Sequence, residues 1–245
     1  MKTTPTSRRP RRILVIDIGG SHVKFRIGPH GKVARFKSGP KLTARQMAKG
    51  VTAKVSRAGY DAVAIGYPGL VFHNRVTAEP HNLGEGWVNF DFHDAFGKPV
   101  RMVNDAAMQA IGSYEGGRML FLGLGTGLGA TLILEGVVEP MELGHLPYKH
   151  GRTYEEYVGE RGRVKLGTRK WRKVVNEVLE QLFHVLEVEY AVVGGGNARR
   201  LRKLPDNVGL GDNTNAFRGG LRLWQCSENP LRVRSVGRRW NHSRR

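Results

Sequence analysis

Two glycine-rich turns have the composition of phosphate-binding loops. In residues 17–24 (DIGGSHVK), Gly19 and Gly20 let backbone N–H groups face an anion without side chains in the way. Ser21 adds a hydroxyl donor, and the Asp17 carboxylate can hold a hydrated Mg²⁺ beside that anion. An ordinary Gly-Gly hairpin is the alternative interpretation of this segment by itself.

The second turn, residues 123–129 (GLGTGLG), joins two apolar stretches. It is not a Walker motif, because no Gly-Lys-Ser/Thr follows, and no helix of the dinucleotide-binding type follows either. A plain glycine hairpin is again the alternative. Two such turns, about one in each half of the chain, favour the interpretation that they grip phosphate between two lobes.

A third segment, Val103-Asn104-Asp105-Ala106, lies where an apolar run gives way to a helix-forming one. A carboxylate at this point can accept the proton of a substrate hydroxyl while the hydroxyl oxygen attacks phosphorus. The alternative is that Asp105 only caps the helix.

Further along, Glu142, His145, Glu155 and Glu156 combine carboxylates with an imidazole. Such groups supply the donors and acceptors that sugar hydroxyls need. Consecutive glutamates also commonly face solvent, so spacing alone leaves this group ambiguous.

Alternating strands and helices must position these groups. Apolar and alternating runs predict strands at Ile13–Ile18, His22–Ile27, 32–37, 61–67, 99–103, 119–124, 130–134 and 190–193, and helices at 43–57, 106–113, 168–188, after Asn197, and at 213–224. This order predicts an α/β fold with two similar lobes split near residue 110: a small N-terminal lobe at 13–110 and a large C-terminal lobe at 111–224. The 33 glycines gather at strand ends, as expected where backbone approaches a ligand.

Charge and cysteine content narrow the class of protein. Lys and Arg number 40 against 21 acidic residues, giving a net charge of +19, and Cys226 is the one cysteine, so no internal disulfide can form. No apolar run approaches the length of a membrane span, and the N-terminal apolar stretch is too short for a signal peptide. We therefore expect a soluble, cytoplasmic protein with a polyanionic partner.

The charge is distributed unevenly. Segments 1–12 and 225–245 carry +5 each and few apolar residues, which predicts two basic disordered tails and leaves +9 between them. Seven basic residues without an acidic neighbour fall within 13 positions: Arg161, Arg163, Lys165, Arg169, Lys170, Arg172 and Lys173. Either a solvated helix face or a binding track for a polyanion explains them.

Six motifs, in order, resemble those of the ROK sugar kinases in the actin/hexokinase superfamily: DIGGSHVK, GYPG, VNDA, GLGTGLG, ELGH and GGGN. Two longer stretches, ELGHLPYKHGRTYEEYVGERG and GDNTNAFRGGLRLW, look like the polyphosphate glucokinase branch. The resemblance covers about residues 13–224. It implies two ribonuclease-H-like lobes around a central cleft.

Carried over by motif, the resemblance makes Asp105 the general base that takes the proton from the sugar 6-hydroxyl. Asn104, Glu142, His145 and Glu155 (with Glu156 as the fallback) would hold the other hydroxyls, and Pro68 and Gly69 would line the pocket. The implied donor-binding residues are Asp17, Gly19, Gly20, Ser21 and Lys24 in the first turn, Gly125, Thr126 and Gly127 in the second, and Gly195, Gly196 and Asn197 where the adenosine of ATP lies.

Two departures from other ROK proteins are informative. The zinc segment CxCGxxGCxE is replaced by LPYKHGRTYEEY, so we expect no zinc at His145. Only 12 residues precede the first strand, too few for the helix-turn-helix domain of the ROK repressors.

The resulting expectation is a glucokinase, commonly a homodimer in this family, that uses polyphosphate and/or ATP with Mg²⁺ to phosphorylate the 6-hydroxyl of glucose or mannose. Arg169, Arg172 and Lys173 at i, i+3 and i+4 would form a polyphosphate track. The alternative is a polyanion- or nucleic-acid-binding protein on a degenerate kinase fold. Trp171 and Trp240, the tryptophans in basic stretches, make a poor base-stacking platform, so a nucleic-acid partner is not expected.

Overall fold

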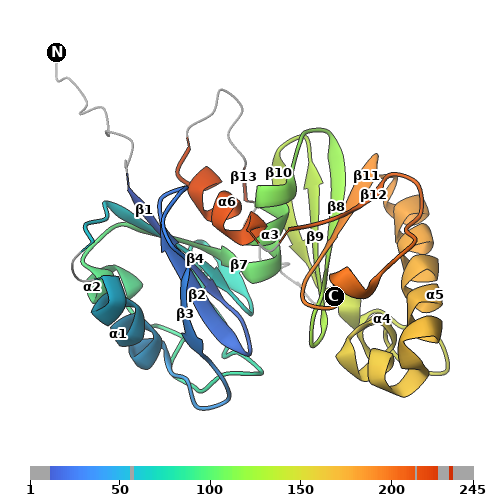
Figure 1. Cartoon of the computed structure of the whole chain (residues 1–245), viewed down its shortest axis with the longest axis horizontal. Coiled ribbons are helices and arrows are strands. Elements are labelled where there is room, and N and C mark those ends of the chain that lie inside the picture. Colours follow the sequence, from blue (N-terminus) through green and yellow to red (C-terminus); the bar gives the residue numbers. More distant parts are fainter. Residues whose placement is uncertain (1–11, 56–57, 213, 226–231, 234–245) are drawn as a thin grey trace, which may run out of the picture.

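Two mixed β-sheets with equivalent strand order form the two lobes (Figure 1). The computed structural model describes residues 12–55, 58–212, 214–225 and 232–233. The first sheet has the order β3-β2-β1-β4-β7: β1 (Ile13–Ile18), β2 (His22–Ile27), β3 (Ala34–Lys37), β4 (Ala62–Tyr67) and β7 (Val100–Asn104). The second has the order β12-β11-β8-β9-β10-β13: β8 (Arg118–Leu124), β9 (Leu128–Leu134), β10 (Val137–Met141), β11 (Tyr190–Gly194), β12 (Val208–Leu210) and β13 (Arg232–Val233).

In each sheet three antiparallel strands are followed by two parallel ones. β1 pairs antiparallel with β2 and parallel with β4, and β8 pairs antiparallel with β9 and parallel with β11. This is the ribonuclease-H-like arrangement repeated twice, so the expected α/β architecture of two such lobes is confirmed. Its consequence for function is that the ends of β1, β7 and β8 point toward one region between the lobes.

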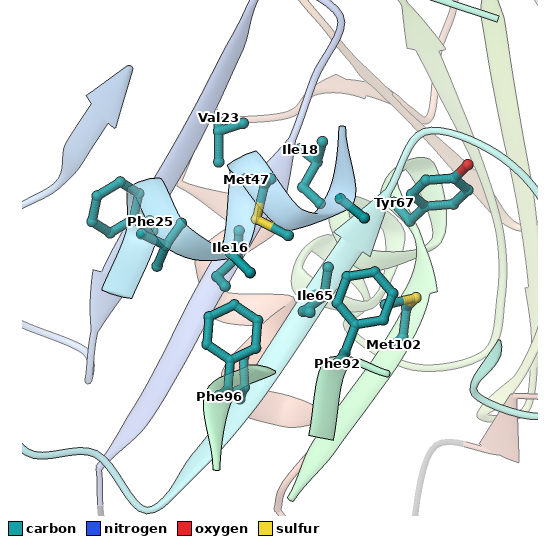
Figure 2. Close-up of a cluster of buried hydrophobic side chains, with 14 of the residues drawn as sticks. Ile16, Ile18, Val23, Phe25, Met47, Ile65, Tyr67, Phe92, Phe96 and Met102 are labelled. Atoms are coloured by element: carbon teal, nitrogen blue, oxygen red, sulfur yellow. The ribbon is translucent and has the colours of Figure 1, made fainter. Parts of the chain in front are cut away.

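Helices cover the outer face of each sheet. In the first lobe, α1 (Ala44–Val55) and α2 (Phe92–Phe96) bury Met47, Phe92 and Phe96 against Ile16 and Ile65 (Figure 2). In the second, α5 (Glu160–Leu186) shares an apolar core with β8 and β11, α4 (Tyr154–Val158) contacts α5 and β9, and the fully buried Trp171 lies in that core. Short strands β5 (Val71–Phe72) and β6 (Arg75–Val76) form a separate hairpin.

The two lobes meet through a pair of helices, α3 (Asp105–Ser113) and α6 (Asn215–Arg222), which lie side by side between the sheets (Figure 1). A third apolar cluster joins Val15 and Ala64 of the first sheet to Phe121 and Ile133 of the second through this pair. The boundary proposed near residue 110 falls inside α3. Although α6 follows β8 to β12 of the second sheet in sequence, it packs on β1 and β4 of the first.

The structure corrects one prediction about helices and adds a segment to another. The helix expected after Asn197 is only a short 3-10 turn, η2 (Ala198–Arg200), because buried Leu201 then anchors the chain as a loop against the α5 core. α5 consists of two helical segments that meet at Gly167, whose φ of 73° and ψ of 150° are not helical. The segment after Gly167 is the predicted helix at 168–188, and the segment from Glu160 to Gly167 was not predicted. Neither the helices α2 and α4 and the turn η1 (Leu143–His145) nor the strands β5, β6, β10, β12 and β13 were predicted.

The predicted basic tails, 1–12 and 225–245, lie outside the described residues apart from Arg12, Gln225 and β13. β13 pairs parallel with the start of β10 at Val137 and Val138. Among the described residues no helix combines the length and the apolar character needed to cross a membrane.

Candidate active site

Three carboxylates from different elements come together where strands of both lobes end. Asp17 lies near the end of β1, Asp105 is the first residue of α3 after β7, and Glu142 follows β10 on the second lobe. The parallel pairing of β1, β4 and β7 brings the ends of these strands to one edge. The charges of Asp17 and Glu142 both act on Asp105, which locates the three groups near one another.

Asp105 has the electrostatics of a proton acceptor that works near neutrality. Burial first, then the negative charge of Asp17 and, more weakly, that of Glu142, raises the pKa of Asp105 to about 7, against the opposing effect of the Ala106 N–H. That N–H donates to Asp105 Oδ1 at 2.8 Å and orients the carboxylate. A base with a pKa near the working pH is suited to general-base catalysis.

The helix-capping role belongs to Asn104, not to Asp105. Asn104 Oδ1 accepts the N–H groups of Ala106 at 2.9 Å and Ala107 at 3.2 Å. Its Nδ2 donates to the Gly69 carbonyl at 3.1 Å, so the Pro68-Gly69 turn predicted to line the sugar pocket is fixed beside α3. Asp105 therefore does not supply the N-cap that was its alternative role.

The first glycine turn joins β1 to β2 and is held in place by hydrogen bonds from Ser38. The Ser38 hydroxyl donates to the Gly19 carbonyl at 2.6 Å, and the Ser38 N–H donates to the Ser21 carbonyl at 3.0 Å. Within the turn, the Gly19 N–H donates to the His22 carbonyl at 3.0 Å, so these three bonds together fix the path of the backbone between β1 and β2. Gly20 also lies against Asn82, where an added Cβ would be 3.5 Å from the Asn82 Cβ.

Asp17 is 9% exposed and lies opposite Lys24, whose Nζ is 3.8 Å from Asp17 Oδ2. Burial raises the pKa of Asp17, and the Lys24 charge partly opposes that rise. The described residues contain no group of three or more His, Cys, Asp or Glu that could hold a metal ion. Mg²⁺ is commonly bound through one or two carboxylates together with substrate phosphates and waters, and the lone carboxylate of Asp17 fits that donor set.

The second glycine turn, between β8 and β9, is held by residues far away in sequence. Asn197 donates its backbone N–H to the Leu124 carbonyl at 2.9 Å and its Nδ2 to the Gly125 carbonyl at 3.2 Å. The N–H of Glu160 donates to the Thr126 carbonyl at 3.2 Å. These bonds fix the turn through its carbonyls.

A chain of polar side chains stands behind that turn. Asn197 Nδ2 also donates to Glu160 Oε2 at 2.9 Å, and Asn197 Oδ1 accepts from Arg200 Nε at 3.2 Å. Arg163 in turn forms a bidentate ion pair with the Glu160 carboxylate. The Arg163 bond, then that of Asn197, holds the pKa of Glu160 down at about 2. The side-chain amide of Asn197, which is only 7% exposed, therefore supports the second glycine turn through both its nitrogen and its oxygen. Sequence reasoning missed Glu160, whose one local signal was an arginine three residues later.

Glu155 reaches the second turn rather than standing apart from it. Its Oε2 accepts the Leu128 N–H at 3.1 Å, and its carboxylate fills the space that a Cβ on Gly127 would need. The fallback residue, Glu156, is exposed and closes a capping box with Thr153 at the start of α4. Glu142 precedes η1 and His145 is the last residue of η1; both are exposed on the same lobe.

A segment that the motifs did not flag lines the first lobe between β6 and α2. Glu79 accepts the Trp87 N–H through both carboxylate oxygens, at 3.1 and 3.2 Å, and Trp87 packs on Tyr67 with ring centroids 5.4 Å apart. The segment thereby holds Asn82 against the first glycine turn. A long stretch without strand or helix periodicity between two predicted strands was the available signal.

The predicted polyphosphate track lies on one side of α5. Arg169 and Lys173 are exposed, and Arg172 Nε donates to the Arg200 carbonyl at 2.5 Å. Trp171 is 0% exposed with its Nε1 bonded to the Val158 carbonyl at 2.8 Å. It therefore offers no surface on which a nucleic-acid base could stack.

Comparison with known proteins places this geometry in a structural class. No protein-family model and no curated protein matches the sequence. Solved structures of sugar kinases do match: the chain has the actin/hexokinase-like fold of the ROK kinases, and the resemblance of its motifs to that family is confirmed.

Among the matches is an inorganic polyphosphate/ATP glucomannokinase from Arthrobacter sp. strain KM, at 25% identity and a TM-score of 0.72 over 86% of this chain and 96% of that one. A ROK glucokinase from Streptomyces griseus, in complex with glucose and AMPPNP, matches at 18% identity and a TM-score of 0.68 over 86% and 98%. A ROK hexokinase from Thermus thermophilus matches at 17% identity and a TM-score of 0.62 over 86% and 97%.

Proposed function

We propose that this protein is a hexokinase of glucokinase type that transfers a phosphoryl group from inorganic polyphosphate, ATP or both to the 6-hydroxyl of glucose, with mannose as a second candidate acceptor. The observation that carries the proposal is the placement of Asp105. Its half-buried carboxylate has a pKa of about 7, is not the cap of its helix, and stands near Asp17 of one glycine turn and Glu142 of the other lobe.

In the proposed reaction the Asp105 carboxylate accepts the proton of the 6-hydroxyl as the hydroxyl oxygen bonds to the terminal phosphorus. The bond from that phosphorus to the bridging oxygen of the donor breaks, and the bridging oxygen leaves with the shortened polyphosphate or with ADP. Positioning and charge neutralisation provide most of the catalysis in phosphoryl transfer. Asn104 contributes by fixing both α3 and the Gly69 turn.

The other residues are assigned by their position around Asp105. Glu142, His145 and Glu155 would hold the remaining hydroxyls from the second lobe, and Pro68 and Gly69 would line the first. The turns at Gly19-Gly20-Ser21 and Gly125-Thr126-Gly127 would cradle donor phosphates, with Lys24 beside the first. When bound, Mg²⁺ neutralises donor oxygens, and Asp17 would hold it through water.

The test is a donor-by-acceptor matrix. Purified protein with Mg²⁺ is assayed for sugar 6-phosphate, using long-chain polyphosphate or ATP against glucose or mannose. We expect turnover with glucose and at least one donor. Absence of product in all four combinations, with glucose binding also undetectable by calorimetry, would eliminate the kinase proposal. Turnover with ATP alone would eliminate the polyphosphate half.

A further inference from the structure

A second basic segment, which no motif marks, lies beside the α5 track. It is the loop after η2, and its cations are Arg199, Arg200, Arg202 and Lys203. Arg172 donates to the Arg200 carbonyl at 2.5 Å, and Asn176, one turn further along α5, donates to the Lys203 carbonyl at 3.1 Å. Side chains of α5 donate hydrogen bonds to the loop's backbone carbonyls, and the Leu201 side chain is buried between the loop and α5. The charged side chains of the loop therefore face solvent.

The cations here divide into two groups. Arg163 and Arg200 are engaged in the support of the second glycine turn, and Arg172 holds the loop. The other cations of the α5 track and of the loop are exposed and form no ion pair within the part of the chain that the structure describes. We call these five residues the basic ridge: Arg169, Lys173, Arg199, Arg202 and Lys203. No acidic residue occurs between Glu160 and Glu177 or between Glu189 and Asp206, so nothing within these segments offsets the charge.

The basic ridge connects directly to the donor side of the site. Arg200, the neighbour of Arg199, donates to the same Asn197 amide that holds the Gly125 carbonyl. A phosphate chain with its terminal phosphate near Asp105 and its next phosphates on the second glycine turn would therefore continue onto the ridge.

We propose that the basic ridge binds the distal phosphates of the polyphosphate donor, those that are not transferred. The inference rests on the proposed kinase function and assigns a second segment, the 199–203 loop, to the donor. Exposed cations along two segments suit a flexible chain with about one charge per phosphate, as basic grooves suit nucleic-acid backbones. Because Trp171 is buried, the tryptophan of the α5 basic segment offers no surface on which a base could stack, which favours a plain phosphate chain over a nucleic acid.

The experiment compares three double variants. Arg199→Gln/Arg202→Gln removes two charges of the ridge; Lys49→Gln/Lys54→Gln removes two exposed charges on α1 and is the matched control. Lys37→Gln/Lys41→Gln removes the lysines of a hollow of about 420 Å³ next to the first glycine turn, the rival route for the chain. Each protein is titrated with fluorescently labelled long-chain polyphosphate and assayed with long-chain polyphosphate, tripolyphosphate and ATP.

We expect the Arg199→Gln/Arg202→Gln variant to bind long-chain polyphosphate about twofold to thirtyfold more weakly, the range for two exposed charge pairs. The slope of log affinity against log salt should fall by about 2. Values of KM for ATP and tripolyphosphate should stay within about twofold of the wild type, because these donors are too short to cover the ridge.

Three binding results would overturn the inference: an equal loss of affinity for polyphosphate in the control variant, a loss confined to the Lys37→Gln/Lys41→Gln variant, and binding of single-stranded DNA to the ridge as tight as that of polyphosphate. Binding at the ridge without turnover of long-chain polyphosphate would also overturn it, while ATP-dependent turnover in the same preparation would leave the kinase function standing. The two proposals thus fail by different measurements.

Discussion

At the scale of single residues, the proposed chemistry depends on which of Asn104 and Asp105 caps α3 and which is left to accept a proton. Either could cap α3, since Asn and Asp are both preferred N-caps. The structure gives the cap to Asn104, so Asp105 keeps one carboxylate oxygen without a helix bond. Burial and the nearby carboxylates then shift the pKa of Asp105 to about 7, where the proposed base must work.

We expect Asp105→Asn to lower kcat by about 10²–10⁴-fold, because the amide cannot accept the hydroxyl proton. For the wild type, kcat/KM should rise with pH through about 7, as the carboxylate of the free enzyme ionises. Steady-state assays from pH 5.5 to 8.5 test both expectations. A near-normal rate in the variant would assign the proton transfer elsewhere.

The same substitution should stabilise the fold at alkaline pH. A carboxyl whose folded pKa is raised from 3.8 to about 7 binds its proton more tightly in the folded state, so its contribution to stability falls as pH rises across that interval. Asp105→Asn removes this dependence. We expect the stabilisation of the Asp105→Asn variant relative to the wild type to be about 1–2 kcal/mol larger at pH 8 than at pH 4. The full pKa shift corresponds to roughly 4 kcal/mol, but the side chain is partly exposed, so water screens part of this effect. Urea unfolding at both pH values measures the difference, and equal gains would contradict the assignment.

At the scale of elements, the second glycine turn is a hairpin whose shape is imposed from outside. Asn197 from the end of β11 and Glu160 from the start of α5 hold its carbonyls. Because the proposed donor site is made of backbone, these side chains act as positioning residues rather than catalytic ones.

Asn197→Ala should therefore affect the donor more than the sugar. It removes the amide from a buried network and should lower the free energy of unfolding by about 1–3 kcal/mol. The loosened turn should reduce kcat/KM for the donor by about 10²-fold, while the dissociation constant for glucose changes little. Calorimetry of glucose binding together with donor kinetics separates the effects; a parallel loss in both would indicate a general structural role.

The contact between α3 and α6 depends on glycine. A Cβ at Gly219 would overlap the Met108 carbonyl oxygen, and one at Gly112 would overlap the Asn215 carbonyl oxygen. Both contacts are backbone against backbone, so neither helix can yield by changing a rotamer.

We expect Gly219→Ala to destabilise the protein by at least about 2–3 kcal/mol, because the added methyl group must separate the two helices. Gly209→Ala, in β12, is the matched control: its Cβ would meet no atom within 4 Å, and its stability should stay within about 1 kcal/mol of the wild type. Urea unfolding at constant pH measures both variants. Equal stabilities would show that the helices separate without cost.

At the scale of the whole molecule, the proposed sugar site takes residues from both lobes. Asn104 and Gly69 lie on the first, and Glu142 and His145 on the second. A hexose bound between them would contact both sheets and tie the unfolding of one lobe to that of the other.

Glucose at 100 times its dissociation constant should therefore add about 2.7 kcal/mol of stability. For a chain of 245 residues, this corresponds to a rise in Tm of about 5–10 °C. Differential scanning calorimetry with D-glucose, and with L-glucose as the mirror-image control, measures the effect. Equal shifts with both sugars would exclude a specific hexose site.

By itself the sequence determined the local features of this protein. Apolar runs ended by glycine set strands such as β1 and β8, and the Gly-Gly and Gly-x-Gly patterns marked the two turns, because these signals depend on neighbours in the chain. Only the tertiary structure decided which polar side chains do what. Asn104 caps α3, Glu155 bonds the N–H of Leu128, Asn197 supports a turn 72 residues before it, and the loop expected as a helix lies flat on α5. Those outcomes depend on burial and on contacts between distant segments, which no local pattern encodes.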